Sequence, residues 1–199
     1  MIRVLIAEDQ ALVRGALVAL LGAEPDIEVV SQCATGTEVA GLLEQSPIDV
    51  ALLDIELPGR NGLDVAADLA SHPCRTLIVT TFGRPGYVKR ALDAGVDGFV
   101  VKDTPPEELA CAIRRVHAGY RVIDPQLASE SLFAPNNPLT DREQDVTRLL
   151  LRGLGAPDVA ATLHLSSGTV RNHVSSIIAK TGAGNRFEAA RLAEDNGWV

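Results

Sequence analysis

Five polar residues follow short apolar segments of the chain directly, and their side chains are of the kinds that carry phosphoryl chemistry. They are Glu8, Asp9, Asp54, Thr80 and Lys102. Each apolar segment has the length and composition of a buried parallel strand, and the carboxyl ends of such strands converge on one crevice of an open sheet. We therefore expect these five side chains to meet.

Three carboxylates in one crevice repel one another unless a cation lies among them, and an oxygen-only site of this kind suits Mg²⁺. With that charge neutralised, the Asp54 carboxylate could attack a phosphorus centre and become an aspartyl phosphate. Lys102 and the Thr80 hydroxyl would then bind the remaining phosphoryl oxygens. The set predicts nucleophilic phosphoryl transfer to Asp54.

Alternating strands and helices must position these residues. Five strands are expected, near residues 2–7, 27–31, 48–53, 75–80 and 97–101. Amphipathic segments separate them, and Thr104–Glu107 has the form of a capping box with proline at the first helical position, which predicts a fifth helix. The pattern indicates an α/β doubly wound, flavodoxin-like domain over residues 1–118.

At these positions the chain resembles the receiver domain of bacterial two-component response regulators. The resemblance rests on five ordered motifs: Glu8-Asp9, Asp54 with Pro58, Gly62, Thr80 and Lys102. It implies that a sensor histidine kinase phosphorylates Asp54, with Thr80 and Lys102 binding the phosphoryl group. It also implies a switch in which Thr80 turns in and Phe99 follows, and an Mg²⁺ ion held by Glu8, Asp9, Asp54 and the backbone carbonyl of Glu56.

The second part of the chain has a different pattern. Residues 119–138 lose clear periodicity, and prolines near their end should resist helix formation, so we interpret them as a linker in which 126–133 could form a short helix. Over residues 139–199, Thr140–Glu143 is a second capping box, a short helix ends near Leu163, and Ser166 is placed to cap a third helix. This all-α arrangement predicts a helix-turn-helix domain.

The third of these helices has an apolar face and an opposite face with donors suited to base edges in the major groove. The segment resembles the DNA-binding module of the NarL/FixJ subfamily, also called LuxR-type, through Leu139-Thr140, Arg142-Glu143, Thr169-Val170 and Asn185-Arg186. The resemblance implies base-facing positions at Arg171, Asn172 and Ser175. It implies phosphate contacts at Thr169, His173, Lys180 and Arg186, and a final helix that pairs two modules.

Composition fits a regulator that works inside the cell. The net charge of −8 lies in residues 1–138, which carry 11 Lys/Arg and 19 Asp/Glu, whereas the remainder carries 7 of each. No apolar run approaches membrane-spanning length and the amino terminus lacks a secretory pattern, so a cytoplasmic location is expected. Three widely spaced cysteines indicate neither a zinc site nor a disulfide framework, and are expected to be small, partly buried thiols.

The function predicted from these features is a DNA-binding transcriptional response regulator, not an enzyme acting on other substrates. Phosphorylation of Asp54 would promote a homodimer that binds double-stranded promoter DNA, with slow autodephosphorylation in the receiver. One alternative is a regulator that binds DNA without phosphorylation and uses the receiver only as a dimer module. A remote alternative is an Asp-nucleophile phosphatase, for which Glu56 is the only candidate acid/base residue.

Overall fold

The structure, a computed structural model, describes residues 1–81, 83 and 85–199, with the side chains of Gln126 and Glu130 outside the description. The chain forms two compact units, one around a sheet (Met1–Gly83 and Val88–Ser129) and one that holds the C-terminal helices (Arg84–Tyr87 and Glu130–Val199). In the described part of the chain, no helix combines the length and apolar character that crossing a membrane requires.

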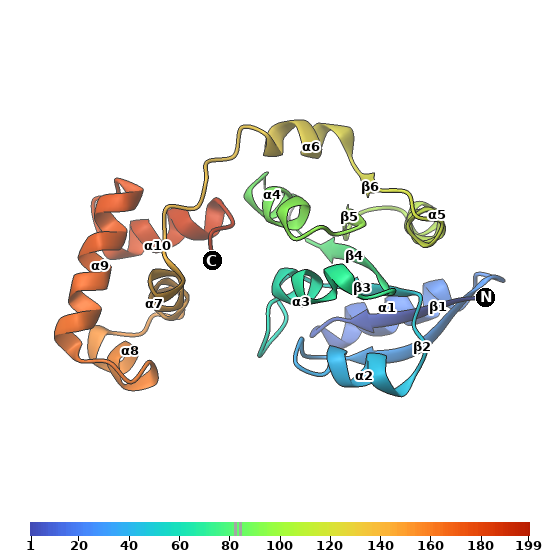
Figure 1. Ribbon diagram of the computed structural model, residues 1–199, viewed down its shortest axis with the longest axis horizontal. Coiled ribbons are helices and arrows are strands. Elements are labelled where there is room, and N and C mark those ends of the chain that lie inside the picture. Colours follow the sequence, from blue (N-terminus) through green and yellow to red (C-terminus); the bar gives the residue numbers. More distant parts are fainter. Residues whose placement is uncertain (82, 84) are drawn as a thin grey trace. The chain divides into compact units, whose positions relative to one another are not determined.

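The first unit is a parallel sheet in the order β2-β1-β3-β4-β5-β6, the doubly wound topology that the sequence predicts. Its strands are β1 Ile2–Ala7, β2 Ile27–Cys33, β3 Val50–Leu53, β4 Arg75–Thr80, β5 Gly98–Val101 and β6 Val122–Ile123. The helices between and after them are α1 Ala11–Leu21, α2 Val39–Gln45, α3 Gly62–Asp68 with the 3₁₀ turn Leu69–Ser71, α4 Pro85–Asp93, α5 Pro106–His117 and α6 Pro125–Ser131. Figure 1 follows this succession along the chain.

The central strands are apolar throughout because the sheet is buried on both faces. All four residues of β3 are buried. Alternate residues of β1, β3 and β4 pack against α5 in one cluster that includes Ile6, Leu52, Leu77 and Ile113. Burying each such side chain contributes about 1.5–3 kcal/mol, so this core fixes the register of the strand ends.

Two local features differ from the expectation. Strand β6 lies inside the predicted linker and extends β5, with Gly98 opposite Val122; two residues are too few to show a period. The capping box predicted at Thr104–Glu107 is wrong, because α5 begins at Pro106 and its N-cap is Pro105, without a side-chain cap. The physical reason is that a residue before proline is confined to extended conformations, so the helix cannot start earlier.

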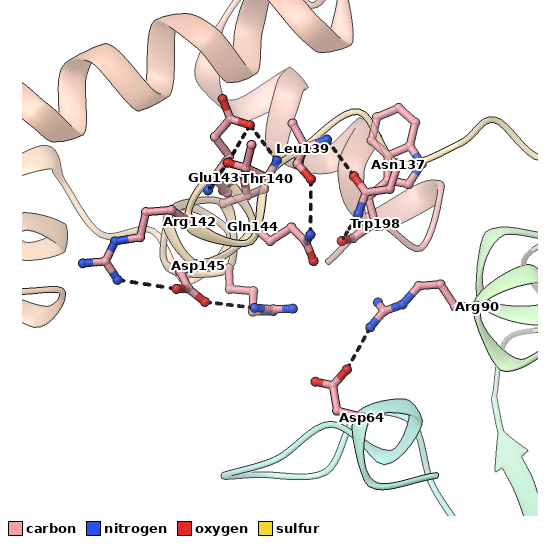
Figure 2. A network of polar contacts seen from close by, with 12 residues as sticks. Asp64, Arg90, Asn137, Leu139, Thr140, Arg142, Glu143, Gln144, Asp145 and Trp198 are labelled. Atoms are coloured by element: carbon pink, nitrogen blue, oxygen red, sulfur yellow. Dashed lines mark hydrogen bonds and ion pairs between the residues drawn. The ribbon is translucent and has the colours of Figure 1, made fainter. Parts of the chain in front are cut away.

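The second unit contains α7 Asp141–Leu151, α8 Ala156–Thr162, α9 Ser167–Thr181 and α10 Arg186–Asp195. The capping box of Thr140 and Glu143 is formed, and the Ser166 hydroxyl accepts from the backbone N–H of Thr169. Figure 2 shows the capping box of Thr140 and Glu143 beside Asn137, whose side chain donates to the carbonyl of Trp198 at 2.9 Å. The predicted helix-turn-helix is confirmed, with α8 and α9 as its two helices.

The three cysteines are free thiols. Cys33 and Cys74 are buried, and burial raises the pKa of the Cys33 thiol to about 11 and that of Cys74 to about 12. Since the thiolate is the reactive form, these two side chains act as small core residues. Cys111 is exposed on α5.

The turn between α8 and α9 contains a strained residue. Among the described residues other than glycine, His164 alone has a positive φ, 54°. We expect His164→Gly to stabilise the second unit by about 1 kcal/mol, because glycine adopts this conformation without steric cost. Thermal unfolding of the full chain, followed by the fluorescence of its one tryptophan, Trp198, measures the effect.

A matched control is Gly153→Ala, in the turn between α7 and α8. Gly153 has φ 81° and open space where a Cβ would lie, so alanine there adds only backbone strain and should lower the unfolding temperature. If both variants shifted the temperature in the same direction, backbone strain at His164 would not be the cause.

Candidate functional site

The carboxylates predicted to gather in one crevice do so. Glu8 and Asp9 follow β1 and Asp54 follows β3, and one oxygen of each lies within 4.8 Å of the others. Glu8 and Asp54 are buried, whereas Asp9 is exposed. Neighbouring parallel strands in register bring these groups together, since Ala7 pairs with Leu53.

Lys102 joins this cluster from the end of β5. Its Nζ lies 2.7 Å from Oε2 of Glu8 and 2.9 Å from Oδ2 of Asp54, and 10% of its side chain is exposed. Burial disfavours the ammonium, but hydrogen bonds to Glu8 and Asp54 outweigh burial and raise the pKa of Lys102 above its ordinary value. Lys102 is therefore a fixed cation beside the Asp54 carboxylate.

The cluster fits a divalent cation. Three carboxylates and one ammonium leave an excess of two negative charges among oxygen ligands, which is the donor set that Mg²⁺ prefers. Glu56, whose backbone carbonyl is a predicted ligand, is the second residue after Asp54 and is exposed. The residues present thus match the group that the sequence implies.

The loop after β3 holds Asp54 in a defined direction. Its Oδ1 accepts from the backbone N–H of Ile55 at 2.7 Å, while Oδ2 faces Lys102. Gly62 lies so close that a Cβ there would stand 1.9 Å from the carbonyl oxygen of Asp54. Asn61 caps α3 immediately before it. Asp54 is therefore presented by a tightly packed turn that only glycine fits.

The two predicted switch residues lie on the adjacent strands. Thr80 ends β4 with 2% exposure, and its carbonyl accepts from the backbone N–H of Lys102 at 2.7 Å. Phe99 lies on β5 opposite Ile78 and is 1% exposed. Thr80 thus borders the crevice through Lys102, while Phe99 is buried one strand further along.

Helix α9 of the second unit presents the predicted base-facing residues together. Arg171, Asn172 and Ser175 are exposed, whereas Val170 and Ile177 on the opposite face are buried in the core of the unit. Such a helix has the form that enters a major groove, with donors along its outer face.

The predicted phosphate contacts lie in two settings. Thr169, His173 and Arg186 are half-buried, and the guanidinium carbon of Arg186 lies 4.6 Å from the ring centre of Phe187. The ammonium of Lys180 instead lies 2.6 Å from Oε2 of the buried Glu143. Lys180 therefore has a partner within the unit.

The sequence predicts Glu143 only as part of a capping box, but in the structure its carboxylate is the centre of a polar network that joins α7 to α9. Besides Lys180, the hydroxyl of Ser176 donates to its Oε1 at 2.6 Å. Burial raises the pKa of the carboxyl, but hydrogen bonds from Lys180, Ser176 and Thr140 outweigh it and lower that pKa to about 2. The partners stand 33 and 37 residues away, so no local spacing could reveal them.

Family models match both parts of the chain. Residues 4–114 match the family model described as response regulator receiver domain, and residues 137–193 match that of bacterial regulatory proteins of the luxR family. The chain is 45% identical over 198 residues to the transcriptional regulatory protein DesR of Bacillus subtilis (strain 168), covering 100% of this chain and 99% of DesR. It is 34% identical to the transcriptional regulatory protein UhpA of Escherichia coli (strain K12), covering both completely.

Solved structures give the same fold. The response regulator ChrA of a heme-sensing two-component system is 30% identical, with a TM-score of 0.57 over 100% of this chain and 98% of that one. A complex of the response regulator RcsB with DNA is 22% identical, with a TM-score of 0.62 over 98% of each chain, a likeness of fold.

Proposed function

Because this chain belongs to the two-component response regulators that join a receiver domain to a luxR-type DNA-binding domain, we propose that phosphorylation of Asp54 promotes its dimerisation on promoter DNA. The chain is a DNA-binding transcriptional regulator rather than a catalytic enzyme. We assign residues 1–118 to the receiver, 119–138 to the linker and 139–199 to the DNA-binding domain. The regulator would act in the cytoplasm, where promoter DNA lies.

The observation that carries the proposal is the contact of Lys102 with Asp54 and Glu8 in the crevice. In the transfer, the P–N bond of a kinase phosphohistidine breaks as an Asp54 oxygen forms a bond to phosphorus. Lys102 and the Thr80 hydroxyl bind the phosphoryl oxygens, and Thr80 moves with them while Phe99 follows. The released imidazole stays with the kinase.

Mg²⁺ is the cofactor that this arrangement calls for. Glu8, Asp9, Asp54 and the backbone carbonyl of Glu56 would hold it, and when bound it offsets the negative charge of the phosphoryl oxygens. The excess negative charge of the cluster supports this assignment. The same crevice would permit slow loss of the phosphoryl group to water.

The receiver also offers a surface for a second copy. Helix α1 presents Leu12, which is 87% exposed, and Leu20, which is 44% exposed. It packs beside α5, whose outer face carries Cys111 and Arg115. We propose this α1/α5 face for the homodimer, because exposed large apolar side chains on one helix favour association.

In the dimer, two copies of α9 would enter adjacent major grooves. Arg171, Asn172 and Ser175 would contact bases, and Thr169, His173, Lys180 and Arg186 would contact phosphates. Because each module binds weakly alone, linkage through the receivers raises the effective concentration and strengthens binding by about 100-fold or more. RcsB has been solved as dimers bound to DNA, which supports this arrangement here.

Sedimentation with Mg²⁺, with and without beryllofluoride as a phosphoryl mimic, tests the proposal on wild type and Asp54→Ala. We expect the mimic to convert the wild type from monomer to dimer and to leave the variant monomeric. Promoter binding should strengthen in parallel. A wild type that is a dimer throughout would contradict a phosphorylation switch and favour the regulator that uses the receiver only as a dimer module. A wild type that stays a monomer would contradict phosphorylation-driven dimerisation in solution and place assembly on the DNA.

The competing regulator that ignores phosphorylation has a clear signature in the same experiment. Asp54→Ala would then bind promoter DNA as tightly as the wild type does. The phosphatase alternative predicts steady hydrolysis of a free phosphate ester. Because the receiver is attached to a DNA-binding module, we expect negligible turnover.

A further inference from the structure

The turn between β1 and α1 carries two of the three carboxylates, and the helix that follows it has no side-chain N-cap. Glu8 and Asp9 precede Gln10, the N-cap of α1, whose side chain makes no capping hydrogen bond. Such a hydrogen bond normally fixes the entry of the chain into a helix. The backbone N–H of Glu8 donates to the carbonyl of Cys33 at 3.1 Å, and a further contact holds the carbonyl groups on the helix side of the turn.

Arg14, in the first turn of α1, supplies that contact. Its Nη1 donates to the backbone carbonyl of Glu8 and, at 3.4 Å, to that of Asp9. Its own backbone N–H donates to the carbonyl of Gln10 at 2.9 Å. A guanidinium is planar and always charged, so it can hold two successive carbonyls in one geometry.

The two carboxylates depend on this turn to different degrees. Glu8 is also held through its side chain, by Lys102 and by the backbone N–H of Gln10 at 3.1 Å. Asp9 is exposed, and in the described part of the chain its carboxylate has no hydrogen-bond or ion-pair partner. The direction of the Asp9 carboxylate is therefore set by the backbone that Arg14 holds.

We propose that Arg14 is a positioning residue for the magnesium site, fixing the backbone of Glu8 and Asp9 so that both carboxylates converge on the cation. This inference rests on the proposed function, which places Mg²⁺ there. Arg14 is itself a cation near the site, so its charge alone would weaken Mg²⁺ binding. The positioning contact of Arg14 thus raises the affinity for Mg²⁺, whereas its charge lowers that affinity. The sign of the change on removing Arg14 therefore shows which effect dominates.

Isothermal titration of the full chain with Mg²⁺ measures this directly. We expect Arg14→Met to bind Mg²⁺ about 10- to 100-fold more weakly than wild type, the usual cost of removing a group that orients metal ligands. Arg14→Lys should recover part of the loss, because an ammonium can hold one carbonyl. Arg121→Met removes the same charge from an exposed position just before β6 and should leave the affinity unchanged.

A kinetic readout separates positioning from general damage. With acetyl phosphate as donor, the Mg²⁺ concentration for half-maximal phosphorylation should rise in Arg14→Met, while the rate at saturating Mg²⁺ stays close to that of wild type. If Arg14→Met does not fold, Arg14→Lys and wild type still give the comparison. Unchanged or tighter Mg²⁺ binding in the Arg14 variants would overturn the inference alone, whereas a wild type that binds no Mg²⁺ would overturn the proposed function with it.

Discussion

Replacing Glu143 by glutamine is expected to lower the free energy of unfolding of the second unit by about 3 kcal/mol. The carboxylate is 4% exposed and links α7 to α9 through Lys180 and Ser176. Glutamine keeps the shape but leaves the Lys180 ammonium without its counter-charge, and it replaces charge-assisted hydrogen bonds by weaker ones. Since α9 is the helix proposed to enter DNA, its position depends on this carboxylate.

Urea unfolding of the full chain, followed by Trp198 fluorescence, reports on this unit because Trp198 is 8% exposed within its core. Asp141→Asn is the matched control: it removes a carboxylate from the first turn of the same helix, but Asp141 is exposed. The control should change stability by less than about 1 kcal/mol. If the two substitutions lowered the free energy of unfolding equally, the buried network around Glu143 would contribute no more stability than an exposed carboxylate on the same helix.

The same carboxylate gives the second unit a pH dependence of known sign. The folded pKa of Glu143 is lowered to about 2 from an ordinary value of 4.5. A lowered folded pKa contributes stability that is present above the ordinary pKa and is lost as pH falls through the folded one. Wild-type stability should therefore decline between pH 4.5 and about 2 more steeply than that of Glu143→Gln. Parallel declines would contradict the assignment.

The phosphoryl crevice could be predicted from the sequence because a parallel sheet converts order along the chain into proximity. Residues just after successive buried strands must share an edge, so Asp54 and Lys102 meet although 48 residues separate them. Helix starts at Thr140 and Ser166 could be predicted from local side-chain chemistry. Both kinds of inference use rules that hold within one element or one sheet.

What the sequence could not reveal depends on packing between helices. Nothing near Glu143 indicates that Lys180 will reach it, because the angle at which α7 and α9 cross decides that contact. Arg14 donates to backbone carbonyls, which every residue carries. The residue types in the sequence therefore cannot show which carbonyls it will contact. Strand β6 depends on the edge that β5 offers and not on its own two residues.

Gly62→Ala is expected to slow phosphorylation of Asp54 by about 100-fold and to destabilise the receiver by several kcal/mol. An alanine Cβ would lie 1.9 Å from the carbonyl oxygen of Asp54 and 2.9 Å from its carbonyl carbon. Backbone atoms cannot yield as a flexible side chain can, so the Asp54 peptide or the start of α3 must shift by about 1 Å. A misplacement of this size typically costs about 100-fold in rate.

The measurement is the rate of phosphorylation by acetyl phosphate at saturating Mg²⁺, together with a thermal melt followed by circular dichroism. Gly41→Ala on α2 is the matched control, because a Cβ there meets nothing within 4 Å and alanine favours a helix. The control should keep the wild-type rate and gain about 0.5–1 kcal/mol of stability. Because a Cβ at position 62 would lie so close to the Asp54 carbonyl, a Gly62→Ala protein with the wild-type rate would show that the turn can relax without moving the carboxylate.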